Sequence, residues 1–323
     1  MRRRDFIKAA TASAVTWPLA ARGQQPERIR SIGVLMPYAK DNLEGQARLA
    51  AFIRELRQLG WTDGRNVKIE YRWDPRDLKK AATEILTLSP DVILANATPA
   101  VAALQQTTHT VPIVFTQVAD PVSAGFVASL AKPGGNVTGF TNFDYDIAVK
   151  WLELLKEIAP NVARVGVIRE PSVTSSIGQL AVINSVARTF GVEVSPLGGR
   201  DARDIESTVT EFASRGPNGG LIAAASPLSI NNPGLIISLA ARHRLPATYP
   251  YRFFVADGGL VSYGPDSVEP HRQAAHYVDR ILKGEKPSDL PVQAPTQYEL
   301  VINLKAAKAL GLTVPHSVLS PRQ

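Results

Sequence analysis

The chain has 323 residues, of which 45% are hydrophobic and 20% charged, a composition typical of a globular protein and not of a disordered one. This length is enough for about two domains. It has no cysteine, which excludes disulfides, thiol catalysis and cysteine-ligated metal centres. The net charge of +7 falls to +3 once residues 1–23, with five Lys or Arg and one Asp, are set aside. The remaining basic charge is spread along the chain, so we expect no nucleic-acid partner.

Residues 1–23 have the pattern of an export signal. A basic segment at 1–8 precedes a weakly apolar stretch at 9–19, and small residues at 20–23 provide a cleavage site. The sequence RRDFIK at 3–8 resembles the twin-arginine signal, which exports folded proteins. A basic amphipathic first helix is the alternative, but Ala, Thr and Ser would make a poor core helix here. We therefore predict a soluble, periplasmic protein, which is not a lipoprotein because it lacks the cysteine that would carry the lipid.

The first half of the mature chain alternates short apolar runs with helical patterns. Continuous apolar runs are typical of buried parallel strands, and alternation is typical of a half-buried strand. Together they predict strands at 32–36, 67–71, 92–95, 113–115 and 137–140. Apolar residues at helical spacing predict helices at 49–59, 78–88, 100–106 and 122–130.

The second half repeats this scheme. It contains predicted strands at 165–168, 192–194, 221–224, 247–249 and 259–262. Helices are predicted at 147–158, 177–190, 205–214, 235–242 and 268–282. Continuous apolar strands separated by helices indicate parallel sheets that are covered on both faces. The predicted fold class is therefore α/β, with two doubly wound parallel-sheet lobes.

Many of the predicted strands run into a proline. Proline cannot extend a central strand, but it suits the first turn of a helix. Thr98, Asp120 and Ser226 are good N-cap residues directly before such prolines. Helix N-termini would then open at the carboxyl edge of each sheet, where ligands bind in open α/β folds and where N–H groups suit a carboxylate. Each turn alone is equally an ordinary structural turn, but the set predicts a ligand cleft. The dipeptides are Met36-Pro37, Thr98-Pro99, Asp120-Pro121, Glu170-Pro171, Ser226-Pro227 and Tyr249-Pro250.

Candidate ligand-binding residues follow from these strand ends. Aromatic side chains near them would form the walls of a pocket, with core or hinge packing as the alternative. The hydroxyls of Thr98 and Ser226 would hold a ligand carboxylate. Asp120 would pair with a ligand ammonium group, if one is present, with a purely capping role as the alternative. The predicted ligand-binding residues are Tyr38, Asn96, Thr98, Gln117, Asp120, Phe140, Asn142, Glu170, Ser226, Tyr249 and Tyr251.

Sequence motifs of common enzyme classes are missing. The chain has no G-x-S-x-G nucleophile elbow, no G-x-x-x-x-G-K-[ST] phosphate loop, no G-x-G-x-x-G and no H-E-x-x-H. His271 and His276 are five positions apart, which places them on different helix faces, so they do not form a metal pair. We predict no enzymatic activity, no catalytic residue, no metal and no cofactor.

Several segments, taken in order, identify a resemblance to a known family. They include Gly64-Arg65-Asn66-Val67, Asp120-Pro121-Val122, Lys132 to Gly139, His243 to Ala247, Gly258 to Gly264 and Arg280 to Gly284. With these segments the chain resembles, over residues 29–315, the extracytoplasmic substrate-binding proteins of ABC transporters. The resemblance is to the branch with the type I periplasmic-binding fold, which includes tryptophan-binding members. The chain departs from this family at two positions. The loop Met36-Pro37-Tyr38-Ala39 is bulkier than the small, Ser- and Gly-rich loop of the family, and Glu170 stands where we expected Asn.

The resemblance implies two lobes joined by three hinge strands, near 139–142, 263–265 and 292–297. Residues 28–139 plus 264–291 would form the first lobe. Residues 140–263 plus 292–323 would form the second lobe, and the ligand would lie between the two.

The resemblance also implies a function. The lobes would close over a small carboxylate-bearing ligand, an amino acid or an aromatic acid, and the closed monomer would dock on the membrane permease of an ABC importer. A ligand-sensing module for a signalling receptor is the alternative. A sugar-repressor-like regulator shares the fold, but it would need an N-terminal DNA-binding segment of about 50–60 residues. Here only about 28 residues precede the first predicted strand.

Overall fold

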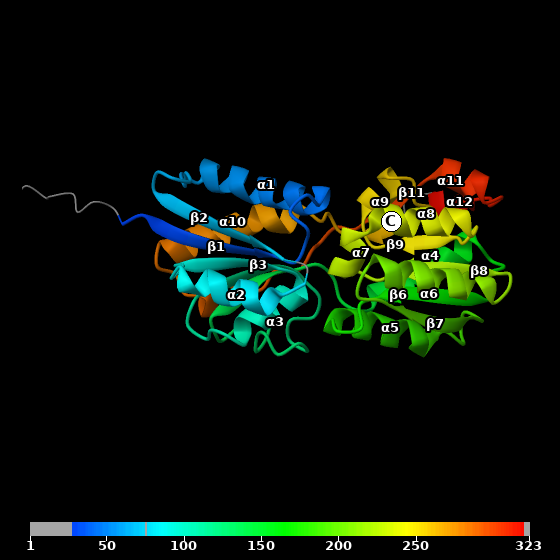
Figure 1. Ribbon diagram of the computed structural model, residues 1–323, viewed down its shortest axis with the longest axis horizontal. Helices are drawn as coiled ribbons and strands as arrows, with labels where there is room; N and C mark the ends of the chain where they lie inside the picture. Colours follow the sequence, from blue (N-terminus) through cyan, green and yellow to red (C-terminus); the bar gives the residue numbers. More distant parts are fainter. Residues whose placement is uncertain (1–27, 75, 320–323) are drawn as a thin grey trace, which may run out of the picture.

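The computed structural model describes residues 28–74 and 76–319. The export signal predicted at 1–23 lies outside these residues. The described chain forms two lobes that lie next to each other along the long axis of the molecule (Figure 1). Each lobe is built on a sheet that is wholly or mostly parallel, with helices packed on both of its faces. The predicted α/β class with two doubly wound lobes is confirmed.

The first lobe contains a five-stranded parallel sheet. Its elements are β1 (Arg30–Met36), α1 (Leu43–Gln58), β2 (Val67–Trp73), α2 (Leu78–Thr87), β3 (Val92–Asn96), α3 (Ala97–Gln105), β4 (Ile113–Val118), β5 (Val137–Thr141), α10 (Glu269–Leu282) and the 3-10 turn η1 (Pro287–Asp289). The strand order is β2-β1-β3-β4-β5. Successive residues of β1 enter two different cores: Val34 belongs to the cluster that holds Phe52 of α1, and Leu35 to the cluster that holds Leu104 of α3. Burial on both faces explains why these strands are continuously apolar.

The second lobe contains a six-stranded sheet. Its elements are α4 (Ile147–Ile158), β6 (Arg164–Arg169), α5 (Thr174–Val186), β7 (Glu193–Gly198), α6 (Ala202–Ser214), β8 (Gly219–Ala223), α7 (Pro227–Asn231), α8 (Pro233–Arg242), β9 (Ala247–Tyr249), α9 (Arg252–Ala256), β10 (Val261–Gly264), β11 (Glu299–Ile302), α11 (Leu304–Ala309) and α12 (His316–Leu319). The strand order is β11-β10-β9-β8-β6-β7. All pairs are parallel except β10 with β11.

The chain passes between the two sheets three times. It leaves the first lobe after β5, returns after β10 to form α10 against α1 and β4, and leaves again before β11. Two crossings are hydrogen-bonded to each other: Thr141 N donates to Gln293 O at 2.8 Å, and Gln293 N donates to Gly139 O at 3.0 Å. A side chain at Gly139, which has a φ of 153°, would overlap the carbonyl oxygen of Phe115. This crossing therefore requires glycine.

The helix predicted at 122–130 is wrong. The segment forms successive turns instead, in which Phe126 N donates to Pro121 O at 2.9 Å. Gly125 has a φ of 74°, which no right-handed helix accommodates. The apolar residues that suggested a helix are partly exposed, with Val122 at 41% and Leu130 at 38%.

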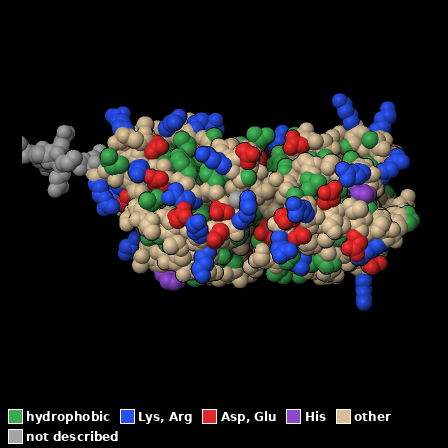
Figure 2. All heavy atoms as spheres, viewed as in Figure 1, with side chains coloured by type: hydrophobic (Ala, Val, Ile, Leu, Met, Phe, Trp, Pro, Cys, Tyr) green, Lys and Arg blue, Asp and Glu red, His purple; other side chains and the backbone are tan. Residues whose placement is uncertain are grey.

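Charged side chains of both signs are interspersed over the two lobes on the face that Figure 2 shows. This agrees with the dispersed basic charge in the sequence. Among residues 28–74 and 76–319, no helix is long and apolar enough to cross a membrane.

Candidate functional site

A cavity lies between the lobes, at the carboxyl ends of strands from both sheets. Its first-lobe wall includes Tyr38 after β1, Thr98 after β3 and Gln117 of β4, and its second-lobe wall includes Ser226 after β8 and Tyr251 after β9. The free space in this cavity is about 10 Å³. That is room for about one water molecule. A larger solute therefore enters only when the lobes separate or the wall side chains move.

A buried polar cluster supports the first-lobe wall. Arg48 of α1 is fully buried, and its Nη1 donates to the hydroxyl of Tyr38 at 2.7 Å. The Tyr38 hydroxyl in turn donates to Asn96 Oδ1 at 2.6 Å. Asn96 Nδ2 and the hydroxyl of Thr116 both contact Nε2 of His271, at 2.5 and 2.9 Å. The ring of Tyr38 is therefore held in place from behind, and burial raises the pKa of its hydroxyl.

Tyr251 connects the two lobes across the cavity. Its hydroxyl donates to Gln117 Oε1 at 2.8 Å and accepts from Asn142 Nδ2 at 3.2 Å. The guanidinium carbon of Arg48 lies 5.5 Å from the ring centroid of Tyr251, and also 5.5 Å from that of Tyr38. Both distances fall within the range of cation–π attraction. The two aromatic walls of the cavity thus share one buried cation.

The short helix α7 makes a second connection between the lobes. Asn231 Oδ1 accepts from Ala39 N at 3.2 Å, and its Nδ2 donates to Pro37 O at 3.2 Å. Asn42 Nδ2 donates to Ile230 O at 2.9 Å. Three hydrogen bonds therefore join the loop after β1 to the end of α7. They depend on the closed arrangement of the lobes, because their partners belong to different lobes.

Unusual backbone conformations cluster at the first-lobe wall. Ala97, Gln117 and Asp120 have φ angles of 66°, 57° and 43°, in the left-handed region that non-glycine residues rarely adopt. The register between β4 and β5 shifts between Thr116 and Val118, so Gln117 lies at a bulge. Backbone strain of this kind persists where the surrounding structure enforces it, and it concentrates at binding sites.

The second-lobe wall combines apolar residues with uncharged polar ones. The first turn of α5 contributes Ser175, which is buried. Gln179, one helical turn further along α5, is completely buried, and its Oε1 accepts from Ala225 N at 3.0 Å. Glu170 lies beside this wall and accepts from Leu228 N at 3.1 Å. Burial raises the pKa of Glu170 above its usual range.

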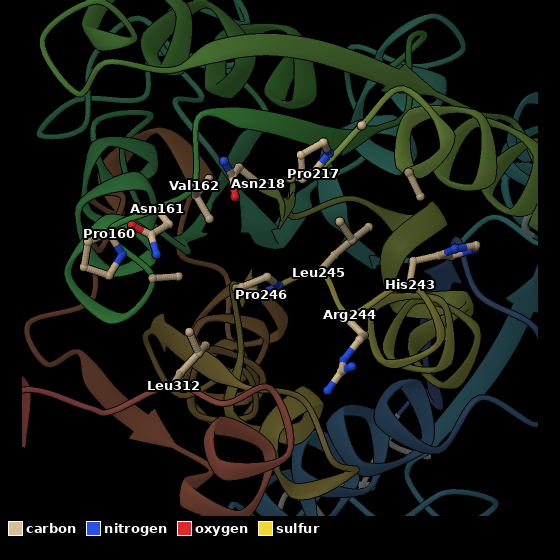
Figure 3. Close-up of a pocket in the computed structure, with 14 residues that line it drawn as sticks. Pro160, Asn161, Val162, Pro217, Asn218, His243, Arg244, Leu245, Pro246 and Leu312 are labelled. Carbon is tan, nitrogen blue, oxygen red and sulfur yellow. The ribbon is translucent and has the colours of Figure 1, made fainter.

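A larger cavity lies at the amino edge of the second sheet, away from the lobe interface. Its free space is about 330 Å³, compared with about 10 Å³ in the interlobe cavity. Figure 3 shows Asn161, Asn218, His243 and Arg244 around it, together with apolar side chains such as Leu312. These residues precede β6, β8 and β9 or come from the C-terminal segment, so they lie at the edge opposite the carboxyl ends where ligands bind in such folds.

Almost the whole chain matches one known protein family. Residues 31–322 match the family described as ABC transporter substrate binding protein. The chain belongs to this family. The resemblance found in the sequence is confirmed.

Two similar proteins have names that concern aromatic amino acids. A tyrosine-binding protein of Clostridioides difficile (strain R20291) is 29% identical over 264 residues, which are 81% of this chain and 75% of that protein. An ABC domain from Streptococcus pneumoniae, solved in complex with L-Trp, is 27% identical with a TM-score of 0.81, over 90% of this chain and 97% of that one. A conserved domain protein from Vibrio cholerae is 29% identical with a TM-score of 0.82, over 90% and 98% of the two chains. Together they support the type I periplasmic-binding fold for this family member.

The structure brings six of the predicted ligand-binding residues to the cavity. These are Tyr38, Thr98, Gln117, Asn142, Ser226 and Tyr251. Asn96 lies one layer behind them, bonded to Tyr38. Asp120 lies in the turn after β4, where its Oδ1 accepts from Ser123 N at 3.0 Å.

Phe140 and Tyr249 do not line the cavity, and neither does Glu170. The ring centroid of Phe140 lies 4.7 Å from that of Tyr277, on the hinge side. Tyr249 stacks on Phe254 at 4.9 Å inside the second lobe. Both aromatic rings therefore lie in core or hinge packing, which the sequence analysis gave as the alternative to a place in the pocket wall.

The buried polar residues of the site that were not predicted from the sequence include Arg48, Ser175, Gln179 and His271. Arg48 had a positional signal, since it lies four residues before Phe52 and eight before Leu56, on the buried face of α1. Gln179 had none, because its neighbours in α5 show no clear apolar period. The pKa of His271 lies well below its usual range, because the ring is buried and because Arg48 is close by.

Proposed function

We propose that this substrate-binding protein is the periplasmic solute receptor of an ABC importer, and that its lobes close over a small carboxylate-bearing molecule, an amino acid or an aromatic acid. The cavity between the lobes carries the proposal. Its walls combine two tyrosine rings with neutral polar groups, as expected for a solute with an apolar body and a polar end. In this proposal residues 28–139 with 264–291 form one lobe, and 140–263 with 292–323 form the other.

Two uncapped helices favour a carboxylate. The first turns of α3 and α5 reach the cavity through Thr98 and Ser175, and neither helix has a side-chain hydrogen bond at its N-cap. The N–H groups of a first helical turn have no partner within the helix, and the helix dipole favours negative charge there. The names of the tyrosine-binding and L-Trp-bound relatives support an aromatic solute.

Closure explains how such a receptor signals that it is loaded. The solute must bind the closed form better than the open one, which shifts the population toward closure. In our proposal the closed monomer docks on a membrane permease and releases the solute chemically unchanged, without catalysis or cofactor.

A thermal-shift panel tests the proposal. A solute at 100 times its dissociation constant stabilises the native state by about 2.7 kcal/mol. For a chain of this length that corresponds to a rise of about 5 °C or more in melting temperature. We expect such a rise with at least one of the aromatic and branched amino acids or aromatic acids, and none with the matching amines and alcohols that lack a carboxylate. A panel of these acids that leaves the melting temperature unchanged contradicts the proposal.

A further inference from the structure

The interlobe cavity contains no charged group in its walls. None of the residues that line it, within the part of the chain that the structure describes, is acidic or basic. Glu44, a nearby carboxylate, is already shared: its Oε1 accepts from Arg48 Nε at 2.9 Å and from the hydroxyl of Ser267 at 2.5 Å. Its charge is therefore already paired with that of Arg48.

Two further carboxylates near the strand ends are also engaged. Asp120 Oδ1 accepts from Ser123 N at 3.0 Å, within its own turn. Glu170 Oε2 accepts from Leu228 N at 3.1 Å, at the start of α7. Neither residue lines the cavity.

The side-chain amide oxygens in the walls have partners as well. Gln117 Oε1 accepts the Tyr251 hydroxyl at 2.8 Å, and Asn142 Oδ1 accepts Phe143 N at 2.9 Å. A solute ammonium group would need acceptors of this kind, and each of these two already accepts one hydrogen bond.

Two unpartnered nitrogens beside the cavity are donors. Arg48 Nη2 and Gln179 Nε2 are buried without a hydrogen-bond partner. The orientation of the Gln179 amide is fixed, because Ala225 N donates to its oxygen, so the free end is the NH₂ group. Ala225 itself lines the cavity, and the Arg48 guanidinium lies over the rings of two lining residues, Tyr38 and Tyr251.

We propose that the solute of this site is a carboxylic acid without an α-ammonium group. This inference rests on the proposed function and narrows its ligand class. The free donors, Gln179 Nε2, Arg48 Nη2 and the first turns of α3 and α5, accommodate a carboxylate. A buried ammonium group without an acceptor carries a large desolvation cost. The chain would differ in this respect from the L-Trp-bound relative.

Matched pairs of solutes test this inference by isothermal titration calorimetry on the full mature chain. Each pair differs only in the α-amino group: L-phenylalanine and 3-phenylpropanoate, L-tyrosine and 3-(4-hydroxyphenyl)propanoate, L-tryptophan and indole-3-propanoate, L-leucine and 4-methylpentanoate. We expect the deaminated member of at least one pair to bind about tenfold or more tightly than its amino acid, a difference of about 1.4 kcal/mol.

The outcomes separate this inference from the proposed function. Tighter binding of the amino acid in the pairs that bind overturns the inference and leaves the proposed function standing. Binding of neither member in any pair contradicts the proposed function itself. Equal affinity within the pairs that bind also overturns the inference, because the ammonium group would then carry no penalty.

A substitution at Gln179 tests the donor assignment. In Gln179→Glu one carboxylate oxygen can still accept from Ala225 N, while the other becomes an acceptor in place of the free donor. We expect the preference for the deaminated member to fall by about tenfold or more. Gln58→Glu, an exposed position at the end of α1, is the matched control and should leave the preference unchanged. An unchanged preference in folded Gln179→Glu removes Gln179 from the site. If this variant does not fold, the matched pairs on the unsubstituted protein decide the inference alone.

Discussion

Two ionisable side chains, those of Arg48 and His271, lie directly behind the cavity, and both are completely buried. Arg48 is balanced by Glu44 and by the Tyr38 hydroxyl, with donor–acceptor distances of 2.9 and 2.7 Å. His271 contacts Asn96 and Thr116 through Nε2. A buried cation and a buried imidazole close together disfavour a second positive charge. The histidine is therefore held neutral, and the cluster fixes the position of Tyr38.

The neutral state of His271 predicts a pH dependence of folding. Its pKa lies well below the usual value in the folded protein, because of burial and the charge of Arg48, and returns to about 6.5 on unfolding. The unfolded state therefore binds more protons once the pH falls below about 6.5. The contribution of neutral His271 to the free energy of unfolding is present above that pH. It is lost as the pH decreases, by at most about 1.4 kcal/mol per pH unit. Urea unfolding at pH 7.5, 6.5 and 5.5 measures this loss.

The variant His271→Gln isolates this effect. It cannot take up the proton, so the difference in unfolding free energy between it and the unsubstituted protein should shrink as the pH falls. The raised pKa of Glu170 acts in the opposite direction but is common to both proteins, so it cancels. His316→Gln, at an exposed position, is the control. Parallel pH profiles for the unsubstituted protein and His271→Gln would show that His271 is not held neutral.

The residues of the site were predictable to different degrees. Tyr38, Thr98 and Ser226 follow strands that the apolar pattern locates, and this placement brings them to one edge of each sheet. The partners of these residues come from helices, so their positions depend on tertiary packing. Arg48 and Gln179 reach the site from the buried faces of α1 and α5, and no local pattern shows which polar residue on such a face contacts a neighbouring sheet.

At the level of elements, the five-residue helix α7 forms hydrogen bonds to the other lobe that would stabilise the proposed closed form. It begins with Pro227 after the N-cap Ser226, whose hydroxyl accepts from Ser229 N at 3.3 Å. Its last residue, Asn231, forms hydrogen bonds with the backbone of Ala39 and Pro37 in the other lobe. The position of α7 therefore couples the second-lobe wall of the cavity to the loop after β1.

Removing the Asn231 side chain should weaken solute binding. In Asn231→Ala the closed form loses two interlobe hydrogen bonds, worth about 1 kcal/mol in net terms. Since the solute binds the closed form, the dissociation constant of the tightest-binding solute of the panel should rise by about fivefold. Calorimetry measures it, with Asn184→Ala on the exposed surface of α5 as the control. A dissociation constant equal to that of the control would mean that α7 does not contribute to closure.

Buried elements, including the three-residue strand β9, were predicted well from the sequence, whereas the edge strand β11 and the short helix α7 were not predicted. Helix α4 has the predicted bounds, and β3 differs from its prediction by one residue, because burial imposes a strong apolar pattern on both. The strand β11 lies at the edge of its sheet with two exposed residues, and α7 is too short to show a period. The turn at Gly125 replaced a predicted helix because a single backbone angle overrode the pattern.

For the whole molecule, the central claim is that the two lobes close on a solute that lies between them. The described structure has the closed contacts: Tyr251 bonds to Gln117, and Asn231 bonds to the loop after β1. Each lobe is built on its own sheet and three chain crossings join them, while one hydrophobic cluster contains buried residues of both lobes. Hinge closure around a ligand is a common transition in two-lobed binding proteins.

The most direct test is the distance between the lobes in solution. Because the chain has no cysteine, Lys79→Cys in α2 and Thr210→Cys in α6 provide two unique sites for spin labels on exposed positions of the two lobes. Double electron–electron resonance should show a broad distance distribution in solute-free protein, and a narrower and shorter one with the tightest-binding solute of the panel at saturation. A distribution that does not change while calorimetry shows the site to be filled would contradict closure of the lobes on the solute.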